Sequence, residues 1–253
     1  MSELVDRVAR EKAAHDGGSI REESRKLHDR FYHVFRCPNS KRAERYFADT
    51  VAGYAKDRDI LDYGCYNGWI TPRYVELGPR SITGLDISES AIAEAVARYG
   101  QFGKFHAGDA HHMEFADESF DLVVGRGILH HLEFDLALKE IQRVLRPGGA
   151  AVFIEPLADN PGAKLMRALT PGYRTIDEAP LSREKIVRAD SLFSSSSHLF
   201  YSLVSVPAGM LTSLTPLGPD NFLLRLADIP DRIMARTRLK YWMRNVVLVW
   251  LKS

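Results

Sequence analysis

A glycine-rich turn and an acidic residue downstream of it are the parts of the sequence best suited to bind a ligand. The turn Asp62–Gly68 reads DYGCYNG and follows the apolar run that starts at Ile60. Asp86 closes the next apolar run, 18 positions after Gly68. Glycines let a backbone turn tightly against a ligand, and an acidic residue at the following strand end accepts hydrogen bonds from ribose hydroxyls. The two features predict a nucleoside site.

The spacing and charge of the turn distinguish between two classes of nucleotide ligand. Dinucleotide sites place pyrophosphate on a G-x-G-x-x-G turn, whereas Gly64 and Gly68 have the spacing G-x-x-x-G. Asp62 stands at the mouth of the turn, and like charges about 4 Å apart repel by about 4 kcal/mol at a surface-like dielectric constant. The same carboxylate attracts the ammonium group of an amino acid. The turn therefore favours a nucleoside joined to an amino acid.

These side chains need a frame that brings several strand ends together. Apolar runs from Asp59 onward predict strands over 60–63, 81–86, 104–106, 120–125 and 150–154, with helices over 91–99 and 136–144 and a final strand over 245–250. Strands separated by helices of this length imply βαβ units and a parallel sheet. Residues 1–54 read as charged amphipathic helices, and Ser40 is expected to cap a helix over 41–54.

An ordered set of segments resembles the class I S-adenosylmethionine-dependent methyltransferases. Ile60–Gly68 is similar to the glycine-rich first motif, and Gly84–Ser88 is similar to the ribose-binding strand end. Ala107–Ala110 looks like the loop on the adenine side. Phe120–Leu132 looks like the fourth-strand motif, and Arg143–Gly149 like the turn after the next helix. The resemblance covers about residues 55–156.

The resemblance implies an α/β fold and a cofactor. The fold is a Rossmann-like seven-stranded, mostly parallel sheet with its last strand antiparallel and helices on both faces. The cofactor is S-adenosylmethionine, and the positions that match its binding motifs are Asp62, Gly64, Tyr66, Gly68, Asp86, Ile87, Asp109, Ala110 and Gly125. Tyr66 departs from the pattern, since the family has its middle glycine there.

The candidate catalytic residues lie at or just past predicted strand ends. They are His130, His131 and Glu155, and His28, Tyr32 and His33 are further candidates if the N-terminal helices form a lid. Methyl transfer from a sulfonium is an in-line displacement that needs alignment more than acid–base chemistry. A base is required when an alcohol loses its proton, so these histidines slightly favour O-methylation. His111 and His112 lack converging carboxylates, and we predict no metal.

The remaining segments suggest how the chain is divided. We expect an N-terminal helical cap over 1–54 and a methyltransferase domain over 55–253 with a lid insertion around 157–220. Within that insertion, Arg167, Arg174, Asp177 and Glu178 suit an ion-pair network or a structural clamp. Residues 191–219 contain no Asp, Glu, Lys or Arg. They fit an apolar acceptor pocket, a membrane contact, or a buried strand and helix.

Composition limits the function classes. The chain has 253 residues, 45% hydrophobic and 26% charged, with a net charge of +1. That profile is globular, and its small net charge argues against a nucleic-acid partner. The charged N-terminus has no apolar signal core, and Cys37 and Cys65 provide no disulfide framework. We therefore expect a cytoplasmic protein without an integral membrane segment; the sequence does not predict its oligomeric state.

The predicted function is methyl transfer from S-adenosylmethionine to a small-molecule acceptor that is at least partly apolar, as in natural-product biosynthesis. Two alternatives stay open. In the first, the chain is a cofactor-binding scaffold without methyl transfer; in the second, it is a non-methylating enzyme such as a cyclase.

Overall fold

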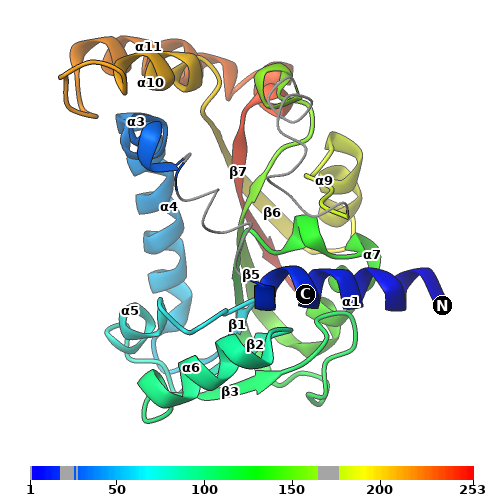
Figure 1. Cartoon of the computed structure of the whole chain (residues 1–253). Coiled ribbons are helices and arrows are strands. Elements are labelled where there is room, and N and C mark those ends of the chain that lie inside the picture. Colours follow the sequence, from blue (N-terminus) through cyan, green and yellow to red (C-terminus); the bar gives the residue numbers. More distant parts are fainter. Residues whose placement is uncertain (1, 18–25, 27, 165–176) are drawn as a thin grey trace.

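Seven strands form one sheet in the computed structural model, which describes residues 2–17, 26, 28–164 and 177–253. Their order across the sheet is β3-β2-β1-β4-β5-β7-β6 (Figure 1). The first five strands of the chain pair in parallel, whereas β7 is antiparallel to both β5 and β6. The predicted fold class, including the antiparallel last strand, is confirmed. The strands are β1 (Asp59–Tyr63), β2 (Ser81–Asp86), β3 (Lys104–Ala107), β4 (Phe120–Arg126), β5 (Leu145–Pro156), β6 (Ser195–Tyr201) and β7 (Asn245–Leu251).

Helices cover both faces of the sheet. On one face Phe47 and Val51 of α4 are buried with Tyr74 of α5, and on the other Leu138 of α7 is buried with Ile186 of α9. The helices are α1 (Ser2–Gly17), α3 (Tyr32–Arg36), α4 (Pro38–Ala55), α5 (Thr71–Val75), α6 (Glu89–Tyr99), α7 (Phe134–Val144), α9 (Arg183–Asp190), α10 (Ser205–Thr212) and α11 (Phe222–Met234), with 3₁₀ turns η1 (Leu129–His131) and η3 (Arg238–Trp242).

Helix α4 begins earlier than its sequence predicts. The expected cap was Ser40, but the helix starts at Pro38 with Cys37 as the preceding residue. Proline suits the first turn, where its missing N–H has no partner to lose. The Ser40 hydroxyl donates to the carbonyl oxygen of Val34 at 2.8 Å. It thereby joins α4 to α3 and does not cap the helix.

The segment that we expected to form a lid around 157–220 contributes to the sheet. It supplies α9, the edge strand β6 and α10, so residues 191–219 contain a strand and a helix. Arg167 and Arg174 lie outside the described residues. Asp177 pairs with Arg10 of α1 at 2.7 Å.

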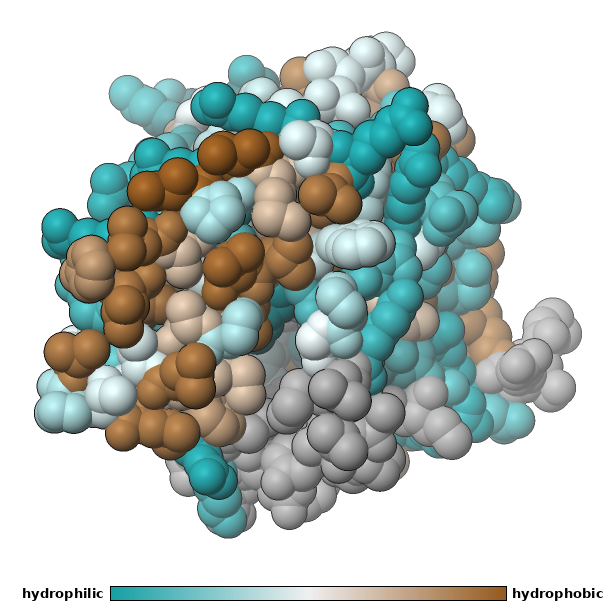
Figure 2. Space-filling model, turned by 90° about the horizontal axis from the view of Figure 1, so that it is seen from above, coloured by the Kyte–Doolittle hydropathy of each residue, from teal (hydrophilic) through white to brown (hydrophobic). Residues whose placement is uncertain are grey.

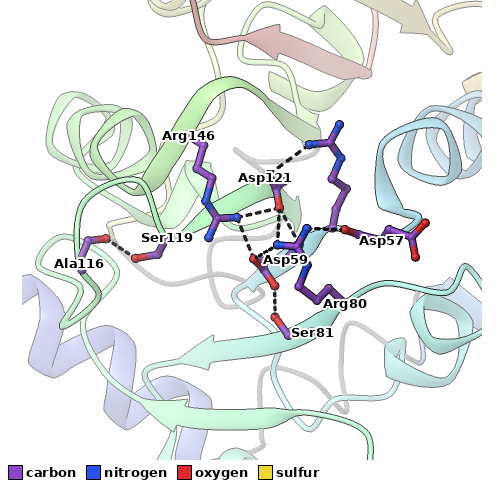
Figure 3. Close-up of polar contacts among 9 residues, drawn as sticks. Asp57, Asp59, Arg80, Ser81, Ala116, Ser119, Asp121 and Arg146 are labelled. Carbon is purple, nitrogen blue, oxygen red and sulfur yellow. Dashed lines mark hydrogen bonds and ion pairs between the residues drawn. The ribbon is translucent and has the colours of Figure 1, made fainter.

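An ion-pair cluster joins the amino ends of several strands (Figure 3). Arg146 of β5 donates to Asp59 of β1 at 2.8 Å and to Asp121 of β4 at 2.7 Å. Arg80 donates to the same oxygen of Asp59 at 2.8 Å, and the Ser81 hydroxyl donates to its other oxygen at 2.8 Å. Burial alone would raise the pKa of Asp59, but these hydrogen bonds and charges outweigh it and lower that pKa. The cluster thus stabilises the sheet at the amino ends of its strands, opposite to the carboxyl ends.

Candidate active site

A cavity of about 260 Å³ lies where the carboxyl ends of β1, β2 and β4 meet. Side chains of the glycine-rich turn, of the loops after β2, β3 and β4, and of α1 line it. The lining includes Arg7, Val8, Glu11, Asp62, Gly64, Cys65, Tyr66, Trp69, Ile70, Leu85, Asp86, Ile87, Gly108, Asp109, Ala110, His111, Arg126, Gly127, Ile128, His131 and Leu132. Ligands of open α/β sheets bind at this edge, so the cavity is the candidate active site.

The glycine-rich turn holds its shape through left-handed backbone. Gly64 has φ +80°, and a Cβ there would lie 2.8 Å from Cγ1 of Ile128, so only glycine fits. Tyr66 also has φ +50°, although a side chain disfavours that region. Its side chain lines the cavity, and its backbone N–H donates to the Asp86 carboxylate at 2.8 Å. The tyrosine thus keeps a backbone conformation that glycine adopts without cost.

Asp86 connects the turn to the following helix. Its carboxylate accepts hydrogen bonds from the N–H of Tyr66 at 2.8 Å and of Ser88 at 3.0 Å. Ser88 in turn caps α6, because its hydroxyl accepts the N–H of Ala91 at 3.2 Å. Asp86 therefore lines the cavity in a fixed orientation, as a ribose-binding carboxylate requires.

Asp62 is a buried carboxylate at the end of β1. Within the described part of the chain, its Oδ2 atom is buried without a hydrogen-bond partner. Burial, and then the negative charge of Asp86, raises the pKa of Asp62 to about 7, although Arg126 acts in the opposite direction. A buried unpaired carboxylate is costly. Its position in the cavity wall suits a cationic ligand group.

Asp109 is held by a histidine that the sequence reading did not identify as a site residue. Its Oδ1 atom accepts from the backbone N–H of His111 at 2.9 Å and lies 2.6 Å from Nδ1 of that ring. Nε2 of His111 accepts the N–H of Glu133 at 2.8 Å, so Nδ1 carries the proton. Burial would raise the pKa of Asp109, but the hydrogen bonds from His111 outweigh it and lower that pKa. A charged Asp109 is therefore maintained at the adenine side of the predicted site.

The other predicted cofactor residues divide into two groups. Ile87 and Ala110 line the cavity. Gly68 and Gly125 lie behind its wall. A Cβ on Gly68 would come within 3.1 Å of the Tyr99 ring, and one on Gly125 within 2.4 Å of Phe153. These two glycines allow α6 and β5 to pack closely under the turn.

Cys65 also lines the cavity, but its chemistry is passive. Burial, and then the charges of Asp62 and Asp86, raise the pKa of the thiol well above its usual range. A thiolate is therefore not available. Cys65 is therefore a small packing residue in the cavity wall.

His131 and Glu11 form a pair in the opposite wall of the cavity. The Nδ1 atom of His131 lies 3.2 Å from Oε2 of Glu11, and both side chains are mostly buried. Glu11 comes from α1, which the sequence reading treated only as part of a helical cap. Sequence spacing gives no signal for the pair, because 120 positions of chain separate its members.

Arg7 fastens α1 over the cavity. Its guanidinium donates to the carbonyl oxygens of His131 at 2.9 Å, Leu132 at 3.1 Å and Asp177 at 2.9 Å. Carbonyls of two separate segments thus converge on one side chain. Charged donors make hydrogen bonds about twice as strong as neutral ones, so Arg7 positions α1 and its Glu11.

His130 and Glu155 lie beneath the loop after β4. Glu155 is 1% exposed, and its carboxylate accepts the N–H of Ile128 and of Leu129, each at 2.9 Å. Its other oxygen lies 2.7 Å from Nδ1 of His130. Burial would lower the pKa of His130, but the hydrogen bond and charge of Glu155 outweigh it and raise that pKa. The pair fixes the loop and does not line the cavity.

His33, named as a further base, packs elsewhere. It is fully buried, and its Nδ1 lies 2.9 Å from the Thr212 hydroxyl of α10. His28 stacks near Phe35, with 4.1 Å between ring centroids. Among the described residues, no group of three or more His, Cys, Asp or Glu side chains has the arrangement of a metal site.

The donors of the cavity fit a nucleoside joined to an amino acid. Asp86 and Asp109 supply fixed carboxylates, the unpartnered Asp62 suits an ammonium, and Gly64 keeps the turn clear of a side chain. Residues 61–153, which include all of these, match the methyltransferase domain family. Residues 61–153 of the chain therefore form a methyltransferase domain of the class I, S-adenosylmethionine-dependent type.

Relatives of this methyltransferase domain differ in their acceptors. The demethylmenaquinone methyltransferase of Chlorobaculum parvum is 35% identical over 103 residues, 40% of this chain and 42% of that protein. The malonyl-[acyl-carrier protein] O-methyltransferase of Erwinia billingiae is 28% identical over 166 residues, 64% of this chain and 62% of that protein. The chain thus spans less than two thirds of the length of either relative.

Solved structures extend the likeness to most of the chain. The geranyl diphosphate C-methyltransferase of Streptomyces coelicolor, solved with S-adenosyl-L-homocysteine, superposes with a TM-score of 0.57 at 14% identity. The match covers 84% of this chain and 80% of that one. At this identity the likeness concerns the fold. The reaction and the acceptor have to be argued from the site.

Proposed function

We propose that the chain transfers a methyl group from S-adenosylmethionine to an oxygen atom of a small-molecule acceptor. The observation that supports this most directly is that the His131–Glu11 pair and three cofactor-type carboxylates, Asp62, Asp86 and Asp109, share one cavity. When bound, S-adenosylmethionine supplies an electrophilic methyl group. The residues of the chain have to hold both reactants, exclude water and accept one proton.

Three carboxylates are assigned to holding the cofactor. Asp86, oriented by the N–H groups of Tyr66 and Ser88, binds the ribose hydroxyls. Asp109, kept charged by His111, binds the exocyclic amine of adenine. Asp62 pairs with the ammonium group, whose charge offsets the cost of burying this carboxylate.

His131 is assigned the role of base. If its Nδ1–H is directed to Glu11, the basic lone pair is on Nε2, which accepts the proton of an acceptor hydroxyl. Glu11 then stabilises the resulting imidazolium. His130 and Glu155 are positioning residues in this scheme, because they hold the backbone from Ile128 to His131.

The acceptor is assigned to the apolar part of the cavity. Val8 of α1, Trp69 and Ile70 after the turn, and Ile128 and Leu132 after β4 contribute that part of the lining. Such a wall favours a small molecule with an apolar body and a hydroxyl group. The middle of the chain, residues 55–156, has 10 basic and 16 acidic side chains, which disfavours nucleic acid.

The test combines binding with product analysis. Calorimetry with S-adenosylmethionine comes first, followed by measurement of S-adenosylhomocysteine release with a panel of small phenols and aliphatic alcohols. Release that depends on one acceptor, and that falls about 100-fold or more in His131→Gln, supports O-methylation by a histidine base. The matched control is His112→Gln, since His112 is exposed.

Two results contradict the proposal. Tight cofactor binding without release of S-adenosylhomocysteine for any acceptor supports a scaffold protein or a non-methylating enzyme such as a cyclase. If S-adenosylhomocysteine is released as fast by His131→Gln as by the wild type, the acceptor needs no histidine base.

A further inference from the structure

Helix α11 presents large apolar side chains to solvent. Phe222, Leu226, Ile229 and Ile233 recur at the spacing of one helix face and are between 49% and 68% exposed. Together with exposed neighbours they form the patch Leu211, Leu214, Leu217, Phe222, Leu223, Leu226, Ile229 and Ile233, which we call the α10–α11 patch. Figure 2 shows apolar side chains gathered on this side of the molecule. Contiguous apolar surface on this scale marks an interaction site.

The acidic residues of α11 point away from the patch. Asp231 is buried and accepts hydrogen bonds from the N–H of Leu203 and of Val204. Asp228 is buried and accepts from Asn39 of α4 at 2.6 Å and from Arg42 at 2.7 Å. These carboxylates hold α11 against the body of the protein, so they add no negative charge to its outer face.

Arginines follow one flank of the apolar stripe. Arg225 and Arg232 are exposed and seven positions apart, which keeps them on one side of α11, and the exposed Arg236 follows the end of the helix at Met234. Arg225 pairs with Asp220 at 2.9 Å, and Arg232 pairs with the buried Asp228 at 2.8 Å. Residues 205–244 contain six basic and three acidic side chains, and two of the acids are buried. The acidic segment 55–156 includes β3 and α6, which lie at the other end of the molecule (Figure 1). The outer face of α11 is therefore apolar with a positive border.

We propose that the α10–α11 patch binds the surface of an anionic lipid bilayer. Insertion of Phe, Leu and Ile below the headgroups, with arginines at their level, is the arrangement of an interfacial amphipathic helix. A second copy of the chain is the weaker occupant, because twofold pairing of this face brings arginine borders of like charge together. No helix of the described residues is long and apolar enough to cross a membrane. The binding proposed is peripheral and does not depend on the proposed methyl transfer.

The test uses the full chain and lipid vesicles. Flotation is compared for neutral phosphatidylcholine vesicles and for vesicles with about 30% phosphatidylglycerol, at low and at high salt. We expect binding to the anionic vesicles that weakens with salt. The double variant Leu226→Glu/Ile233→Glu is expected to bind the anionic vesicles at least about tenfold more weakly than the wild type, since charged side chains replace inserted apolar ones. Arg236→Gln is expected to weaken binding only at low salt.

The control variant is Val96→Glu, which places one glutamate, half of the charge added by the double variant, on a similarly exposed apolar position of α6. It should bind vesicles as the wild type does. Circular dichroism and thermal unfolding of each variant show that the fold is kept. Equal flotation of the Leu226→Glu/Ile233→Glu variant and the wild type overturns the proposal. A second result also overturns it: the wild type fails to bind anionic vesicles and sediments as a dimer, and the double variant sediments as a monomer. The patch is then covered by a second copy of the chain.

Discussion

Single carboxylates carry most of the predicted chemistry at the residue scale, and the environment of each one decides its charge. Asp109 is kept ionised by His111, whereas Asp62, buried at the end of β1, has a pKa raised to about 7. The difference arises because Asp109 receives hydrogen bonds and Asp62 Oδ2 has none among the described residues. Two aspartates in the same cavity wall therefore respond differently to pH.

Asp62→Asn should stabilise the cofactor-free protein at alkaline pH. Because the folded-state pKa of Asp62 is raised, its contribution to stability is fully present below its unfolded pKa, near 3.8, and is lost as the pH rises through about 7. The variant should equal the wild type near pH 3, where Asp62 is protonated in the folded and the unfolded chain, and exceed it at pH 8 by on the order of 1–3 kcal/mol. Urea unfolding at both pH values measures this. The control Asp49→Asn, at an exposed position, should change nothing.

The same variant should bind S-adenosylmethionine less tightly, because it lacks the charge that meets the ammonium. Gain of stability with loss of affinity separates a ligand-directed carboxylate from a structural one. A variant that is destabilised at pH 8 would contradict this account of Asp62.

Asp86→Asn should weaken S-adenosylmethionine binding by about 10- to 100-fold, because hydrogen bonds to a charged acceptor contribute about 1.5–3 kcal/mol. The amide retains one acceptor oxygen for the N–H of Tyr66 or of Ser88 but loses the charge. Calorimetry measures the affinity, and the exposed Glu76→Gln is the control. Unchanged affinity in Asp86→Asn would remove the ribose assignment.

At the element scale, the two ends of the parallel strands have different functions. The carboxyl edge carries the cavity, whereas the amino edge carries the cluster of Asp59, Arg80, Asp121 and Arg146 (Figure 3). Arg146 is the only member that donates to both carboxylates at less than 3 Å among the described residues. Loss of this residue removes the donor that the two carboxylates share: Arg80 still pairs with Asp59, but Asp121 keeps only longer ion pairs, with Arg58 at 3.4 Å and Arg80 at 4.0 Å.

Arg146→Leu should therefore lower stability without changing cofactor affinity. We expect a loss of about 1–2 kcal/mol at pH 7, since the pair is partly exposed and screened. The pKa of Asp59 is lowered in the folded state, so this stabilisation is present above its unfolded pKa and is lost as the pH falls through the folded one. Urea unfolding at pH 7 and pH 3 should show the difference from wild type shrinking. Arg98→Gln, which breaks an exposed ion pair with Glu94, is the control.

The whole molecule shows which features a sequence can reveal. The positions of β1 to β5 and of β7, and the turn Asp62–Gly68, were predictable, because hydrophobic periodicity and glycine spacing are local properties. The antiparallel last strand was expected only from the family resemblance. The positions of Glu11 and Arg7 in the cavity wall were not, because they depend on how α1 crosses the carboxyl edge. Likewise, the role of Glu155 beneath the loop depends on burial, which spacing alone does not give.

Closure of the site by α1 depends on the whole molecule, because segments that are far apart in the sequence hold this helix in place. Arg7 joins α1 to the carbonyls of His131, Leu132 and Asp177, so one side chain links three segments that are far apart in sequence. Arg7→Gln should leave the global unfolding transition almost unchanged. It should speed hydrogen exchange in α1 and raise the dissociation constant of S-adenosylmethionine about tenfold, because a loosened helix admits water above the cofactor. Arg36→Gln, at the end of α3, is the control. If exchange in α1 is unaffected by Arg7→Gln while affinity falls, Arg7 contacts the ligand directly and the helix is held by other contacts, such as that of Lys12 with Glu89.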